Sequence, residues 1–167
     1  MPDQHHRTVT PQTQFFIAHD WVPNHPRLPV LIYPRVEPEG DSAGALERRF
    51  ADNGWPPAWR DGVFDYHHYH STAHEVLGIA AGTARLLLGG PGGKAFDVRQ
   101  GDVILLPAGT GHCRVSASTD FLVVGAYPVG QKPDLCQQAA TEEMLARIAA
   151  LAWPARDPVN GDVMRAG

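Results

Sequence analysis

Residues 66–78 read YHHYHSTAHEVLG and hold four of the nine histidines of the chain and one of its six glutamates. On a β-strand, residues i and i+2 face the same side, so His68 and His70 should project together while His67 and Tyr69 face away. Two side chains about 6–7 Å apart along a strand can converge on one metal ion. Glu75 follows after enough residues for a tight turn, so the next strand can return its carboxylate to the same point.

A fourth candidate ligand lies about forty residues further along the chain. His112 stands in LPAGTGHCRV, residues 106–115, where Pro107 and Gly109 predict a turn that can aim the imidazole inward. Imidazole suits Zn, Cu, Fe and Ni, carboxylate adds Mn, and no cysteine pair lies nearby to indicate a structural zinc site. We therefore expect one divalent ion (Fe, Mn, Ni, Co or Zn), with two positions of an octahedral site left open for water, dioxygen or a chelating substrate.

Glycine and proline divide the surrounding chain into short elements, which is typical of a sandwich or barrel of strands. Earlier strands are expected at Phe15–Ala18 and Val30–Tyr33, and GWPPAW (residues 54–59) reads as a turn. Helical spacing of apolar residues predicts helices over 41–53 and 141–152. The strands of the central meander are expected at 63–70, 75–82, 83–90, 94–101, 102–109, 112–117 and 120–129. We expect an all-β single domain over 1–167, with its core at about 60–130 and flanking segments 13–59 and 131–167.

Length and charge exclude several classes of function. The chain has 167 residues and a formal net charge of -4, without a long run of Lys and Arg, which makes nucleic acid a poor candidate partner. Its longest apolar runs are too short to span a bilayer, and the N-terminal sequence lacks the pattern of a secretory signal. Two cysteines, Cys113 and Cys136, are too few for a disulfide framework. These features favour a cytoplasmic protein with a small-molecule ligand and no membrane partner.

The two histidine-bearing stretches resemble the two sequence motifs of the cupin superfamily. The first motif, G-x5-H-x-H-x(3,4)-E-x6-G, matches GVFDYHHYHSTAHEVLGIAAG, residues 62–82. The second, G-x5-P-x-G-x2-H-x3-N, matches GDVILLPAGTGHCRVS, residues 101–116, except that its final Asn is Ser116. The resemblance covers roughly residues 60–130. It implies a jelly-roll β-barrel, a homodimer, and a metal ion bound inside the barrel by His68, His70, Glu75 and His112.

Four further residues are candidates for roles beside the metal. Tyr66 precedes His68 by two positions and can place a hydroxyl near the ion, or simply pack in the barrel. His74 is a candidate base or alternative ligand, or else a loop histidine exposed to water. Arg114 follows His112 by two positions and can bind an anionic group of a substrate, or form an internal ion pair with Asp97 or Asp102. Tyr127 ends an apolar strand and is a candidate to line the cavity.

The resemblance leaves the activity open, because cupins include dioxygenases, isomerases, epimerases, decarboxylases, lyases and binding proteins. The favoured hypothesis is a metal-dependent enzyme acting on a small polar or anionic molecule by a dioxygenase-type reaction. The alternatives are a metal-dependent isomerase or epimerase and a cupin that binds a small molecule without converting it. An oxygenase requires Fe(II) and air, whereas an isomerase is indifferent to air and a binding protein returns its ligand unchanged.

Overall fold

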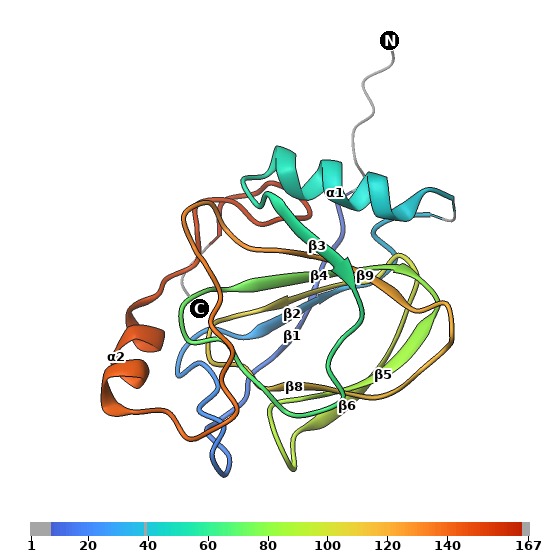
Figure 1. Ribbon diagram of the computed structural model, residues 1–167. Helices are drawn as coiled ribbons and strands as arrows, with labels where there is room; N and C mark the ends of the chain where they lie inside the picture. Colours follow the sequence, from blue (N-terminus) through green and yellow to red (C-terminus); the bar gives the residue numbers. More distant parts are fainter. Residues whose placement is uncertain (1–7, 39, 165–167) are drawn as a thin grey trace.

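The computed structural model describes residues 8–38 and 40–164, and its strands form two antiparallel sheets (Figure 1). The six-stranded sheet has the order β1-β2-β7-β4-β9-β3, and the three-stranded sheet the order β6-β5-β8. The elements are β1 Gln12–Gln14, β2 Val30–Tyr33, α1 Ser42–Asp52, β3 Pro57–Asp61, β4 Glu75–Ala81, β5 Thr83–Leu88, β6 Lys94–Arg99, β7 Val103–Leu106, β8 His112–Ala117, β9 Leu122–Ala126 and α2 Glu142–Ala150. This arrangement confirms the predicted all-β, jelly-roll class with flanking helices.

The central strands of the larger sheet are buried on both faces, because their successive side chains point alternately into two hydrophobic cores. On β7, Val103 and Leu105 belong to the core beneath α1, whereas Ile104 and Leu106 belong to the core between the two sheets. The same alternation on β4 directs Leu77 and Ile79 between the sheets. Successive side chains on a strand point to opposite faces, so Glu75 at the start of β4 also points between the sheets. The alternation thus places a carboxylate at the edge of an apolar interior.

Both predicted helices are present, and each is shorter than expected by one or two residues at its ends. Asp41 caps α1, because its side chain accepts a hydrogen bond from Gly44 N, and Thr141 caps α2 in the same way. Helix α1 lies against β4 at Gly78, where an added Cβ would stand 2.9 Å from the ring of Phe50. The absence of a side chain at Gly78 therefore allows the helix to approach the sheet closely.

Two of the expected elements near the N-terminus are wrong. Phe15–Ala18 is not a strand, since β1 ends at Gln14, which pairs with Val30. The next position opposite Phe15 would be Pro29, which has no N–H to donate, so the ladder stops. Residues 57–59, expected to form part of a turn, belong instead to β3, Pro57–Asp61, at the edge of the larger sheet. Pro57 is tolerated there because it is the first residue of an edge strand.

The predicted strand over 63–70 is also wrong. Only His68 and Tyr69 make isolated bridges, His68 to His112 and Tyr69 to Cys136. His68 pairs with β8 and the next residue, Tyr69, pairs with the segment that follows β9, so no continuous ladder forms. The predicted segment is nevertheless fixed at both positions, because each bridge contains two backbone hydrogen bonds.

Two other features of the described residues bear on the sequence-based expectations. Cys113 and Cys136 are both free thiols. Within the described ranges, no helix has the length and apolar character needed to cross a membrane.

Candidate metal centre

Three imidazoles meet at one end of the space between the sheets. The ligand nitrogens of His68, His70 and His112 all lie within 4.8 Å of one another. His68 Nδ1 lies 3.0 Å from the Tyr66 carbonyl oxygen and His112 Nδ1 lies 3.0 Å from that of Thr110. His70 Nδ1 contacts the carbonyl oxygen of a residue in the C-terminal part, Asp134. A carbonyl only accepts hydrogen bonds, so each Nδ1 carries a proton and Nε2 is the nitrogen left to bind a metal ion.

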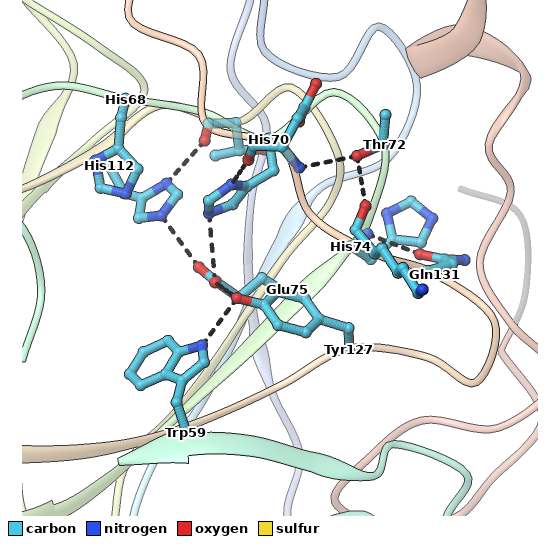
Figure 2. A network of polar contacts seen from close by, with 12 residues as sticks. Trp59, His68, His70, Thr72, His74, Glu75, His112, Tyr127 and Gln131 are labelled. Atoms are coloured by element: carbon cyan, nitrogen blue, oxygen red, sulfur yellow. Dashed lines mark hydrogen bonds and ion pairs between the residues drawn. The ribbon is translucent and has the colours of Figure 1, made fainter. Parts of the chain in front are cut away.

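Glu75 joins this group from the first residue of β4. Its Oε2 lies 3.3 Å from His70 Nε2, and its Oε1 lies 3.1 Å from His112 Nε2 (Figure 2). Behind the carboxylate, the Tyr127 hydroxyl donates to Oε2 at 2.9 Å and accepts a hydrogen bond from Trp59 Nε1 at 2.8 Å. Glu75 is only 3% exposed. The carboxylate is therefore oriented from one side by Tyr127 and faces the imidazoles on the other.

Burial and mutual charge set the protonation of the metal-free group. Burial, reinforced by the neighbouring His112, lowers the pKa of His68 to about 3. Burial also acts to lower the pKa of His70, but the Glu75 carboxylate outweighs it and raises that pKa to about 9. The pKa of Glu75 lies well below its usual value because His70 and His112 outweigh the effect of burial. His68 is thus neutral at pH 7, while His70 carries a proton that a metal ion must displace.

The donor set fits a divalent transition metal. It provides three imidazole nitrogens and one carboxylate oxygen, all less than a tenth exposed, without a thiolate. That mixture of nitrogen and oxygen suits Fe, Mn, Ni, Co or Zn rather than the all-oxygen sites of Mg and Ca. The three carbonyls that fix the rings are the outer support that metal-binding histidines usually have. The structure thus brings together all four residues predicted as ligands, and they could hold one ion.

Two of the other predicted residues lie next to this group. Tyr66 stacks on Phe64 with ring centroids 4.9 Å apart, and its ring meets that of His68 edge-on at 5.7 Å. Tyr127 contacts Glu75 directly, as described above. The structure thus places Tyr66 beside one candidate ligand and Tyr127 behind another.

Arg114 lies on β8, opposite the buried Leu86 and therefore on the inner side of the three-stranded sheet. Its Nη2 is 3.9 Å from Oδ2 of Asp65, and its buried Nε has no hydrogen-bond partner among the described residues. The internal ion pairs expected with Asp97 or Asp102 do not form. Asp97 pairs with Arg85, and Asp102 accepts hydrogen bonds from backbone N–H groups. Part of the guanidinium is therefore still available to an anion.

His74 is neither exposed to water nor directed at the other histidines. Its exposed fraction is 0%, its Nδ1 accepts from Ala108 N at 2.9 Å, and its Nε2 lies 2.8 Å from the Ala152 carbonyl oxygen. Burial lowers the pKa of His74 to about 4, which keeps it neutral. Because both ring nitrogens already have partners, His74 ties the C-terminal segment to the turn before β8, and the expectation of a wet loop histidine is wrong.

Two residues that support this group were not predicted as part of the site. Trp59, in the stretch expected to form a turn, donates a hydrogen bond to Tyr127. Asp134 lies in a segment without periodicity or motif, and only its contacts with residues 70–72 reveal it. Trp59 lies in a Pro-rich stretch. Such a stretch predicts a turn more readily than an edge strand, so the sequence did not indicate that Trp59 supports the site.

Two facing antiparallel sheets with imidazoles and a carboxylate between them define a jelly-roll protein with a candidate metal centre. A family model described as cupin matches residues 64–138. A protein of Bacillus subtilis (strain 168), uncharacterized protein YjlB, is 40% identical over 152 residues, which cover 90% of each chain. The chain belongs to the cupin family.

Solved structures show weaker likeness. A DUF861 family protein from Thermotoga maritima is 19% identical with a TM-score of 0.34, over 57% of this chain and 96% of that one. Streptomyces albus HEPD, solved with 2-hydroxyethylphosphonate and Fe(II), is 13% identical with a TM-score of 0.28, over 76% of this chain and 22% of that one. These TM-scores are too low to carry an argument about metal or reaction.

Proposed function

We propose that this protein is a divalent-metal-dependent enzyme that acts on a small anionic molecule by a dioxygenase-type reaction. The observation that carries the proposal is the orientation of the three clustered imidazoles, each fixed at Nδ1 by a carbonyl, with the Nε2 atoms of His70 and His112 facing Glu75. Such a group is already arranged for a metal before the metal binds. A redox-active ion such as Fe(II) would supply binding of dioxygen and activation of a chelated substrate.

Arg114 supports the assignment of an anionic substrate. It lies two residues after His112, and within residues 8–38 and 40–164 its buried Nε has no hydrogen-bond partner. Its one ion pair is long, at 3.9 Å, and Asp65 is largely exposed. A carboxylate, phosphonate or phosphate could therefore take the place of Asp65 and bind the guanidinium through two parallel hydrogen bonds.

The aromatic residues would complete the site without taking part in redox chemistry. Tyr66, stacked on Phe64, forms an aromatic wall beside His68. The Tyr127 hydroxyl keeps Glu75 in place, and burial together with the Glu75 carboxylate raises the pKa of this phenol above its usual value. It therefore stays protonated and donates at all physiological pH values. A homodimer and a small-molecule partner remain predictions from the sequence.

Oxygen uptake tests the reaction class. Protein loaded with Fe(II) is mixed with small anions that carry two adjacent oxygen donors, such as 2-hydroxy acids, 2-oxo acids and hydroxyphosphonates, and dissolved oxygen is followed. We expect uptake with at least one of them, lost in Arg114→Gln or under a large excess of chelator. Turnover that continues unchanged without air would refute the dioxygenase proposal, and binding without turnover would refute catalysis. An Arg85→Gln variant is the matched control, because Arg85 forms an exposed ion pair on the outer side of the neighbouring strand.

A further inference from the structure

Residues 131–138, here called the strap, lie along the segment that carries His70. The strap follows β9 and leads towards α2 (Figure 1). It forms a two-bond backbone bridge between Cys136 and Tyr69, and the Tyr69 hydroxyl donates to the Gln138 carbonyl. Nearer its start, the side chain of Gln131 accepts from His74 N at 2.9 Å (Figure 2). The strap therefore holds residues 69–74, here called the ligand-bearing segment, at both ends.

Asp134 occupies the centre of this contact and binds three consecutive residues. Its carboxylate accepts hydrogen bonds from Ser71 N, at 2.6 Å, and from the Ser71 hydroxyl. Its own N–H donates to Thr72 Oγ1 at 3.0 Å, and that hydroxyl donates to the Lys132 carbonyl at 2.6 Å. Its carbonyl oxygen contacts His70 Nδ1. One residue thus fixes both the backbone after His70 and the ring of His70 itself.

The other two imidazoles do not depend on a distant segment in this way. His68 and His112 each contact the carbonyl of the residue two positions earlier in their own segment, Tyr66 and Thr110. Their orientation is therefore local. The carbonyl that orients His70 belongs to Asp134, 64 residues away in sequence. The hydrogen bond from Ser71 N to the Asp134 carboxylate holds this carbonyl beside the ring.

We propose that Asp134 is a positioning residue for the metal: its carboxylate, through Ser71, holds the Asp134 carbonyl where it orients His70. The inference rests on the metal site of the proposed function. A substrate-independent consequence is that loss of the carboxylate lets the His70 ring turn, which weakens metal binding and changes the geometry of the ligands. Loss of an outer hydrogen-bonding partner of a metal ligand typically weakens metal binding about 10- to 100-fold.

A purely structural role is the rival explanation, and Asp157 provides a matched control. Asp157 is a buried aspartate whose carboxylate, like that of Asp134, accepts from backbone N–H groups, here those of Val159, Asn160 and Asp162. None of those residues belongs to the ligand-bearing segment. Asp157→Ala should therefore lower stability as Asp134→Ala does, yet leave the metal site unchanged.

Titration with Co(II) separates the two roles, because its visible absorption reports the geometry of its ligands. Affinity is measured by competition with a chelator for wild type, Asp134→Ala, Asp134→Asn and Asp157→Ala. We expect Asp134→Ala to bind Co(II) about 10- to 100-fold more weakly with an altered spectrum. Asp134→Asn should lose less, because its amide oxygen still accepts one bond from Ser71. Asp157→Ala should match wild type in affinity and spectrum.

Wild-type affinity and spectrum in Asp134→Ala would overturn the proposal. An equal loss in Asp157→Ala would also overturn it, since the effect would then follow general destabilisation. If Asp134→Ala does not fold, Asp134→Asn and Ser71→Ala carry the test, and wild-type binding by both would overturn it. Failure of the wild type to bind Co(II) is a different result, because it would refute the metal site and with it the proposed function.

Discussion

Tyr127→Phe is the substitution whose effect the structure defines most closely. It removes only the hydroxyl, which donates to Glu75 Oε2 at 2.9 Å and accepts from Trp59 Nε1 at 2.8 Å. The variant leaves a half-buried indole N–H without its partner and removes the phenol donor from a buried carboxylate. Phe has the same ring, so the packing of the side chain should change little.

The expected loss of stability follows from these two bonds. A hydrogen bond to a charged group contributes about 1.5–3 kcal/mol, and a buried donor left unpaired costs about 1–3 kcal/mol. Partial access to water at this position reduces both effects, so we expect a loss of about 2 kcal/mol. For a chain of this size that corresponds to a fall in Tm of about 4–8 °C. Metal affinity should fall at least about tenfold, because Glu75 is then free to turn.

Thermal unfolding of the metal-free protein and chelator competition with Zn(II) measure the two effects separately. Tyr33→Phe is the control, since Tyr33 is buried in the other core, beneath α1. Trp59 and Glu75 share the Tyr127 hydroxyl. The double variant with Trp59→Phe and Tyr127→Phe should therefore lose less stability than the sum of the losses of the two single variants. Unchanged metal affinity in Tyr127→Phe would refute the view that Tyr127 positions a metal-binding carboxylate.

Three further outcomes follow from the same structure. Gly125→Ala should lower Tm by several degrees, because an added Cβ would lie 2.1 Å from the ring of Trp59; an unchanged melting curve would contradict this close contact. Burial lowers the pKa of His74 to about 4, so the unfolded chain binds a proton between pH 6.5 and 4 that the folded one does not. Urea unfolding should therefore show stability falling through that window, by about 2 kcal/mol at pH 5, and the fall should be smaller in His74→Gln. At pH 7.5 metal binding should release about one proton, because the metal-free pKa of His70 is about 9. Calorimetry in two buffers of different protonation enthalpy measures that release, and none would be found if His70 were not a ligand.

The candidate ligands were predictable because the information about them is local. The spacing of His68 and His70 fixes their relative direction, and a glycine-bearing turn aims His112. Strands β4 to β9 were predictable from apolar alternation and glycine breaks. The short turn before Glu75 returns its carboxylate to the same point, the family motifs name the same four residues, and the structure brings them together.

The remaining features depend on pairing between distant segments, which spacing does not encode. The segment 63–70 looks like a strand, but its hydrogen bonds go to two different partners. Strand β3 looks like a turn, because Pro57 and its largely exposed side chains give no alternation. Asp134 could not be identified, because its role arises only when the strap folds back onto Ser71, 63 residues earlier.

The central claim is that His68, His70, Glu75 and His112 bind one divalent ion. The most direct test is the metal content of untagged protein prepared without chelator, measured by mass spectrometry for wild type, His70→Ala and His67→Ala. The account predicts about one equivalent of Fe, Mn, Ni, Co or Zn in wild type and in His67→Ala, and little in His70→Ala. Protein that contains no metal and takes none up on incubation, or a full equivalent retained by His70→Ala, would contradict it.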